Sequence, residues 1–295
     1  MHPKCKSLCA GAALVLKILL GLMFIGSGVL KLIGIDTFEI YIYSFGFFSL
    51  PLSFLLARIC IVGEIVLGVG LVANMFNRLM VTAALCVVTL FSCFLCYAAL
   101  IGRSDSCQCF GSLVEITPTA SLVKNAGLII LLLLVRKVRS WRWRPRWFVW
   151  VPVVLAVLVG VFCISVPDNW MFGPEEEILN YEKLGQAIEE GGELADAGLI
   201  EGKKLVAFFT PGCPFCKMAR QKLTTMTERF DLPRESLVWV YPVKDSLHGI
   251  APETFMEITY GQRPEVVLLE GGEKVKSYHY RNIDEKEIAD FLGSR

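Results

Sequence analysis

Charged residues are scarce in the first half of this sequence, and histidines are scarce throughout it. Charged residues make up 19% of the 295 residues and concentrate in roughly the last 120, whereas hydrophobic residues make up 54% and the mean hydropathy is +0.55. This composition predicts a chain that is part membrane and part soluble. The sequence also lacks a phosphate-binding glycine loop, a nucleotide fingerprint and a haem-attachment motif, so nothing in it supports those classes of site.

The apolar residues fall into runs of about 20, the length that a transmembrane helix needs. We predict five spans, at Ala10–Ile33, Leu52–Ala73, Leu79–Ile101, Ala120–Val135 and Phe148–Val166. A cleavable signal peptide is the alternative for residues 1–33, because Lys4 and Lys6 resemble its positive start. The apolar run is too long for a signal peptide and has Lys31 near its far end, so a membrane span is favoured.

Lysine and arginine mark the sides of the membrane. They open the first span, separate the second from the third at Arg78, and recur between residues 136 and 146, which predicts that these segments are cytoplasmic. With five spans, the N-terminus is then cytoplasmic and the C-terminal region is periplasmic, in a multi-pass protein of the bacterial inner membrane. The basic run also contains tryptophans, which favours an interfacial lipid anchor over a nucleic-acid site.

Residues 175–295 predict one small α/β domain. The expected elements are a helix at Glu175–Glu190, a strand at Leu205–Thr210, a helix at Lys217–Arg229, a strand at Leu237–Val243, a helix at Pro252–Tyr260, a hairpin of Val266–Leu269 and Lys274–His279, and a helix at Asp284–Leu292.

Cys213-Pro214-Phe215-Cys216 stands at the expected strand-to-helix junction. The helix dipole and free backbone N–H groups favour a thiolate at Cys213, which predicts that Cys213 attacks and that Cys216 resolves the mixed disulfide. A static disulfide or half of a zinc site are the alternatives. We expect no metal, because only His248 and His279 accompany the motif and they are far apart in sequence.

Two further cysteine pairs belong to the apolar region. Cys107 and Cys109 lie in a loop that we predict on the periplasmic side, where a strained Cys-x-Cys disulfide suits electron relay; a structural staple or two idle thiols are the alternatives. Cys93 and Cys96 share one face of the third span. They are candidates for a couple near a quinone, although packing of small apolar side chains is the favoured interpretation.

Ionisable residues inside apolar helices are costly and indicate function by default. Lys31, Arg58, Glu64 and Lys124 are such residues. We predict that they stabilise a thiolate or a reduced quinone, which makes quinone the expected cofactor. The alternative is a structural ion pair of Glu64 with Arg58 or Lys31, with lysines near helix ends extending to the interface.

The C-terminal domain resembles thioredoxins and glutaredoxins in its Cys-Pro-Phe-Cys-Lys segment, in its element order and in Pro264, which falls where that family has a cis-proline beside the catalytic disulfide. The resemblance implies a thioredoxin fold with Pro264 in the active site. Two features depart from the family. Ala207 replaces a buried acid, so proton removal from Cys216 must use water or another group, and the segment 210–212 replaces a tryptophan-bearing approach.

The apolar region resembles the DoxX-like MauE family over about residues 12–135. The resemblance is carried by segments 24–32 and 63–68, by Cys-Gln-Cys-Phe-Gly at 107–111, and by Lys124-Asn125. It implies a four-helix membrane domain that acts in disulfide formation during maturation of an amine dehydrogenase, beside a thioredoxin-like protein that is fused here. The architecture is also similar to that of bacterial vitamin K epoxide reductase homologues, which pass electrons to a quinone.

We therefore expect a MauE/DoxX-like domain at residues 1–136, a basic loop, fifth span and linker at 137–174, and a thioredoxin-like domain at 175–295. The expected activity is that of a membrane thiol–disulfide oxidoreductase that forms disulfides in extracytoplasmic client proteins containing cysteine. Electrons would pass from Cys213/Cys216 to Cys107/Cys109 and on to quinone. A reductase that runs in the opposite direction and a non-enzymatic, membrane-anchored maturation factor are the alternatives.

Overall fold

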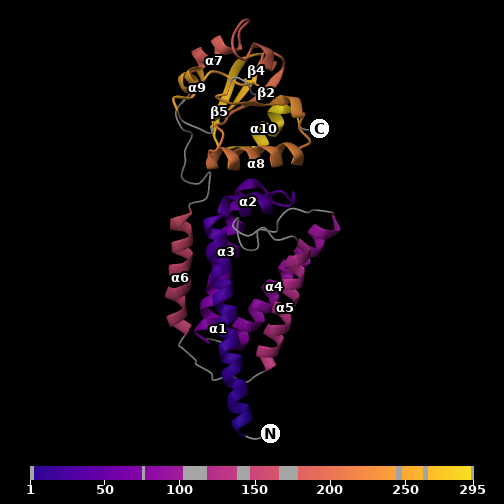
Figure 1. Ribbon diagram of the computed structural model, residues 1–295, viewed down its shortest axis with the longest axis vertical. Helices are drawn as coiled ribbons and strands as arrows, with labels where there is room; N and C mark the ends of the chain where they lie inside the picture. The colour runs from indigo at the N-terminus through magenta and orange to yellow at the C-terminus, as the bar shows by residue number, and fades with distance from the viewer. Residues whose placement is uncertain are drawn as a thin grey trace. The chain divides into compact units, whose positions relative to one another are not determined.

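The chain divides into two compact units (Figure 1). The computed structural model describes residues 3–74, 77–101, 118–137, 147–165, 179–243, 248–261 and 265–293. One unit, residues 1–42 with 53–166, is helical, and the other, residues 43–52 with 167–295, contains a small mixed sheet. The predicted sequence of a helical region followed by an α/β region is confirmed.

The helical unit contains α1 (Pro3–Ile33), α2 (Ile35–Tyr43), α3 (Leu50–Val72), α4 (Asn77–Leu100), α5 (Pro118–Lys137) and α6 (Trp147–Ile164). Helices α1, α3, α4 and α5 are long and apolar enough to cross a membrane. The chain is therefore a multi-pass membrane protein. Helix α6 corresponds to the fifth predicted span, but its apolar stretch, Trp150–Ile164, is shorter than the other four, so its crossing stays a prediction.

Helix α6 runs antiparallel to α3. At its start, the Trp150 ring lies close to Gly70, where an added Cβ would be 3.4 Å from the ring. At its end, the Ser165 carbonyl accepts a hydrogen bond of 2.8 Å from Arg58 Nε. The stretch of α3 between Arg58 and Gly70 is about 18 Å long, at about 1.5 Å per residue. Thus α6 follows much of the length of α3 although it is the shorter helix.

Glycines allow α1 and α3 to approach closely. A Cβ added at Gly21 would lie 2.7 Å from the Gly68 carbonyl oxygen, and a Cβ added at Gly68 would lie 2.7 Å from the Gly21 carbonyl oxygen. Farther along the same interface, a Cβ at Gly28 would lie 2.7 Å from the Ile65 side chain. Backbone approaches this close require residues without a Cβ, as at many membrane helix crossings.

The second unit contains α7 (Tyr181–Ile188), η1 (Ala195–Ala197), β2 (Lys203–Phe208), α8 (Pro214–Arg229), η2 (Arg234–Ser236), β3 (Leu237–Val240), α9 (Pro252–Thr259), β4 (Glu265–Glu270), β5 (Glu273–His279) and α10 (Glu285–Leu292). The strand order is β3-β2-β4-β5. Strand β2 is parallel to β3 and antiparallel to β4, with Val206 opposite both Val238 and Val267, and β4 is antiparallel to β5.

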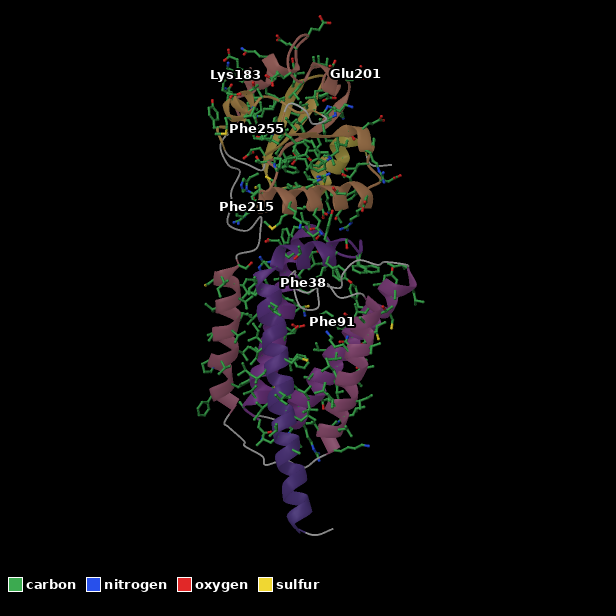
Figure 2. The ribbon with its side chains drawn as sticks, viewed as in Figure 1. Phe38, Phe91, Lys183, Glu201, Phe215 and Phe255 are labelled. Carbon is green, nitrogen blue, oxygen red and sulfur yellow. The ribbon has the colours of Figure 1, made fainter. Side chains whose placement is uncertain are left out.

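Strands β2 and β4 are buried on both faces of this sheet. Val206 and Phe208 face the side of α7 and α9 (Figure 1), where they join the cluster that contains Phe255. Phe255 points from α9 into the core (Figure 2). Because side chains alternate along a strand, Leu205 and Ala207 face the opposite side, which α8 and α10 cover. Strand β2 is thus held by neighbours on both edges and both faces.

Most predicted elements are present with small changes at their ends. The strand predicted at residues 205–210 is β2, which begins two residues earlier, and the helix predicted at 175–190 is confirmed only as α7 among the described residues. The sequence analysis missed α2. Its sequence, IDTFEIYIY, is too short for a span and is rich in β-branched and aromatic residues, which favour strands in isolation.

The α1–α3 crossing gives a testable prediction. We expect Gly68→Ala to lower the free energy of unfolding by about 1–3 kcal/mol, because the new methyl group meets backbone atoms that cannot rotate away. Thermal or chemical unfolding of the purified chain in detergent measures the change. Gly63→Ala on the same helix is the control, since a Cβ there meets nothing within 4 Å. Equal effects at both positions would contradict the close crossing.

Candidate functional site

Cys213 stands where the loop from β2 enters α8. The loop turns at Gly212, whose φ of +78° is a left-handed conformation that favours glycine. The Cys213 amide donates a hydrogen bond of 3.3 Å to the Thr210 carbonyl, and Pro214 follows as the first helical residue. Proline suits that position because its fixed φ matches a helix and its missing N–H would have no partner there. The local sequence therefore fixes Cys213 as the N-cap of α8.

The Cys213 sulfur lies at the positive end of α8. Its Sγ accepts a hydrogen bond of 3.3 Å from the Cys216 amide. The N-terminal N–H groups of a helix carry partial positive charge, so both the helix and this donor favour negative charge on the sulfur. This is the environment in which cysteines act as nucleophiles.

Cys216 lies one turn later and is far less accessible. It is 3% exposed, and its Sγ accepts a hydrogen bond of 3.5 Å from the Thr210 amide, whereas Cys213 is only partly buried. Beside them, the Phe215 side chain is 46% exposed, and its ring lies 5.9 Å from the Tyr280 ring. A reagent or protein that approaches this end of α8 thus meets Cys213 and an apolar side chain first.

Three residues that the sequence analysis selected, Cys107, Cys109 and Pro264, lie outside the described residues. Cys93 and Cys96 are described. Both are exposed on the surface of α4, whereas Leu95 between them is 1% exposed and packs inward. In the described part of the chain, therefore, neither Cys93 nor Cys96 fills the interior of the bundle.

The four intramembrane ionisable residues separate into two groups. In the first, Arg58 forms an ion pair with Glu39 of α2. The guanidinium also donates hydrogen bonds to the Phe54 carbonyl at 2.7 Å and to the Ser165 carbonyl and hydroxyl at 2.8 and 3.1 Å. Arg58 is 2% exposed. This group fastens α2 and the end of α6 to α3.

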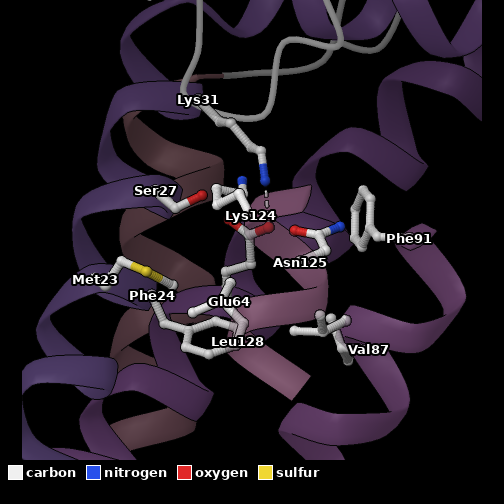
Figure 3. Close-up of a pocket in the computed structure, with 11 residues that line it drawn as sticks. Met23, Phe24, Ser27, Lys31, Glu64, Val87, Phe91, Lys124, Asn125 and Leu128 are labelled. Atoms are coloured by element: carbon white, nitrogen blue, oxygen red, sulfur yellow. Dashed lines mark hydrogen bonds and ion pairs between the residues drawn. The ribbon is translucent and has the colours of Figure 1, made fainter. Parts of the chain in front are cut away.

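The second group joins α1, α3 and α5. Lys31 forms an ion pair with Glu64, and the Lys124 and Asn125 side chains are directed toward the same space (Figure 3). The Lys31 ammonium also lies 5.4 Å from the Phe38 ring centroid and 5.1 Å from that of Phe91, in cation–π geometry. Lys31 and Glu64 are both buried. The sequence left open whether Glu64 pairs with Lys31 or with Arg58. In the structure Glu64 pairs with Lys31.

A small cavity adjoins this second group. Its volume is about 40 Å³, its polar lining comes from Ser27, Lys31, Glu64, Lys124 and Asn125, and α4 contributes apolar side chains. Pockets for drug-sized ligands measure about 300–1,000 Å³. The described cavity is smaller than these pockets, and its volume is enough for water molecules.

Sequence reasoning missed some members of both groups. Glu39 was overlooked because its helix was overlooked, and Ser27 and Asn125 were not read as parts of a polar site. Asn125 Nδ2 donates a hydrogen bond of 3.3 Å to Ser92 Oγ, which extends the polar group to α4. The available signal was spacing: Ser27 precedes Lys31 by four residues, and i, i+4 positions share a helix face.

Comparison with known proteins agrees with this division. Residues 10–138 match the family model of the methylamine utilisation protein MauE. The matched residues, which we call the MauE region, include most of α1 and all of α2 to α5. A relative, Protein TlpB of Flavobacterium psychrophilum, is 23% identical over 300 aligned residues, which cover 83% of this chain and 81% of the relative. That coverage exceeds the MauE region, so the similarity includes part of the second unit. No solved structure matches the chain.

The Arg58 group in the MauE region gives the second prediction. We expect Arg58→Met to lower the free energy of unfolding by about 3–5 kcal/mol, because the Glu39 carboxylate is left buried without its partner. Chemical unfolding in detergent measures the loss. The double variant Arg58→Met/Glu39→Gln removes both charges and should regain most of it. A double variant as unstable as Arg58→Met would contradict a dominant role for the ion pair.

Proposed function

We propose that the chain is a membrane-bound thiol–disulfide oxidoreductase with Cys213 as the nucleophile and Cys216 as the resolving cysteine. The observation that carries this proposal is the contrast between the two thiols. The Cys213 sulfur is accessible at a helix N-terminus and accepts an N–H hydrogen bond, while Cys216 is buried one turn away. A purely structural disulfide requires neither that one sulfur be more accessible than the other nor that a hydrogen-bond donor contact one of the sulfurs.

The second unit supports this proposal through its topology. A parallel β2–β3 pair with α8 between them, followed by the antiparallel strands β4 and β5, is consistent with the thioredoxin-like domain that we propose. In that fold Pro264, directly before β4, would lie beside the cysteine pair. The similarity to TlpB, which includes part of this unit, is consistent with a protein in which a membrane region and such a domain work together.

We propose the oxidising direction, which the same sulfur environment supports. A client thiolate attacks Cys213 in the Cys213–Cys216 disulfide, Cys216 leaves as a thiolate, and a second client thiol then displaces Cys213 to close the client disulfide. Groups that stabilise reduced Cys213 favour this outcome, because a stabilised reduced form makes a disulfide a stronger oxidant. The clients are extracytoplasmic proteins with cysteines, and the exposed Phe215 offers them an apolar contact.

Regeneration of the Cys213–Cys216 disulfide needs an acceptor for two electrons. We assign this role to Cys107 and Cys109, whose disulfide is reduced as Cys213–Cys216 is reoxidised. Quinone is the proposed final oxidant, because two electrons and two protons convert it to quinol and it dissolves in the bilayer. Cys93 and Cys96 are candidates for that last transfer, since both are exposed on α4, where lipid would cover the helix.

The proposed location is the bacterial inner membrane, with the N-terminus in the cytoplasm and the second unit in the periplasm. The distribution of lysine and arginine supports this orientation. Disulfide chemistry supports it as well, because disulfides persist in the periplasm and are reduced in the cytoplasm.

Trapping tests the role of the soluble pair. We expect Cys216→Ser to accumulate mixed disulfides through Cys213, both with client proteins and with Cys107 or Cys109, because the resolving thiol is gone. Nonreducing electrophoresis with mass spectrometry of the linked peptides identifies the partners. Cys86→Ser, which changes an exposed thiol of α4, is the control and should trap nothing. Cross-links that persist when Cys213 is also replaced would contradict the assignment.

Thiol trapping in membranes tests the acceptor and the direction. We expect Cys213/Cys216 to be oxidised in growing cells, and to become fully reduced in cells unable to make quinone or in the Cys107→Ser/Cys109→Ser variant. If the soluble pair stays reduced even when quinone is present, the chain is a reductase or a tethered maturation factor. Normal oxidation in the double serine variant would remove the relay from the proposal.

A further inference from the structure

The two buried ion pairs of the MauE region use different cations. Glu39 is paired with Arg58, and Glu64 is paired with Lys31. A guanidinium does not lose its proton in proteins, whereas a buried lysine ammonium loses its proton readily. The Arg58 pair is therefore fixed in its charged form, and the Lys31 pair is not.

The two ion pairs also differ in how completely their polar atoms are hydrogen-bonded. All three nitrogens of the Arg58 guanidinium donate hydrogen bonds. Glu64 is 6% exposed, and its Oε2 is buried with no hydrogen-bond partner among the described residues. A buried carboxylate oxygen without a donor is costly, which indicates that a group outside the described residues completes this site.

Water fits the space beside Glu64. The cavity of about 40 Å³ exceeds the roughly 10–15 Å³ of comparable volume that one water molecule requires. A buried water also needs about two to four polar partners. Ser27, Glu64, Lys124 and Asn125 line the cavity and supply them (Figure 3).

The charges of the group do not balance. Lys31 from α1 and Lys124 from α5 face Glu64, so the fully ionised group carries a net charge of +1 in apolar surroundings. Loss of one proton would make the group neutral. Cys60 lies one turn before Glu64 on α3 and is also within electrostatic range of Glu64 and Lys31. The lining that α4 contributes to the cavity is apolar. Because these groups interact strongly, the exchanged proton is assigned to the group as a whole and not to a single residue.

We propose that Lys31, Glu64 and Lys124 form a proton-exchanging site whose ligand is the water of this cavity, while the Arg58–Glu39 pair is a fixed clamp. The link to catalysis rests on the function proposed above. Oxidation of a dithiol by quinone moves two electrons and two protons, and the quinone must receive its protons inside the membrane. The site would take up and release one of these protons during the transfer.

The two carboxylates allow an internally controlled test by nuclear magnetic resonance. The full chain, labelled with carboxyl-¹³C glutamate in lipid nanodiscs, is titrated with acid and base, and the two signals are assigned by their loss in Glu64→Gln and Glu39→Gln. We expect the Glu64 signal to shift with pH as the site exchanges its proton. The Glu39 signal should not shift over the same range, because Arg58 keeps its charge.

The outcomes separate the proposals. Two signals that both stay constant, or that shift together, would overturn the proton site. This readout needs no thiol turnover, so it remains valid if the chain proves not to be an oxidoreductase. If Glu64→Gln does not fold, Glu64→Asp keeps a carboxylate but removes the labelled glutamate, and the lost signal gives the same assignment.

The coupling to catalysis has its own measurement. The rate of client oxidation with a soluble quinone is measured as a function of pH in the wild type and both glutamine variants. We expect the pH dependence to change in Glu64→Gln and to be preserved in Glu39→Gln, even if both variants are slower. A profile unchanged in Glu64→Gln would exclude a role of the site in the reaction.

Discussion

The two described ion pairs within the helical unit reflect one constraint, which is the cost of removing charge from water. An unpaired ion inside apolar helices costs several kcal/mol or more, so Arg58 and Lys31 are stable there only with partners in reach. Their partners, Glu39 and Glu64, come from other helices, and the ion pairs therefore also set how α1, α2, α3 and α6 are aligned. The close glycine crossing of α1 and α3 lets Lys31 reach Glu64 without a gap between the backbones.

The second unit meets a different requirement of the proposed function, which is the placement of the Cys213 sulfur. Strand β2 lies between β3 and β4, and its side chains are buried on both faces, so its C-terminal end is rigid. The short turn at Gly212 connects this rigid end of β2 to Cys213. The Cys216 amide then defines the environment of the Cys213 sulfur from within the same turn of α8. Reactive groups supported by rigid elements in this way keep their geometry through repeated reactions.

The sequence predicted what depends on local pattern. Long apolar runs identified the four long spans, and a strand followed by Cys-Pro-Phe-Cys located the N-cap of α8 because proline and the helix dipole act locally. It did not predict α2, whose helical form comes from burial of residues such as Phe38 and Glu39 against other helices. The sequence also left open which basic residue pairs with Glu64. Lys31 and Arg58 were equally good candidates from the sequence, and only the packing of the helices distinguishes them.

In the proposed relay, the presence of both cysteine systems in one chain changes what their contact would require. Exchange between separate proteins depends on their concentrations and affinity, whereas exchange between tethered parts proceeds at an effective concentration that reaches about the millimolar range for short flexible linkers. A tethered Cys213 therefore needs no strong binding to its membrane partner. Strong binding would compete with clients for the same accessible sulfur and the same exposed Phe215. A weak and brief contact within one chain leaves the end of α8 available to extracytoplasmic thiols for most of the time.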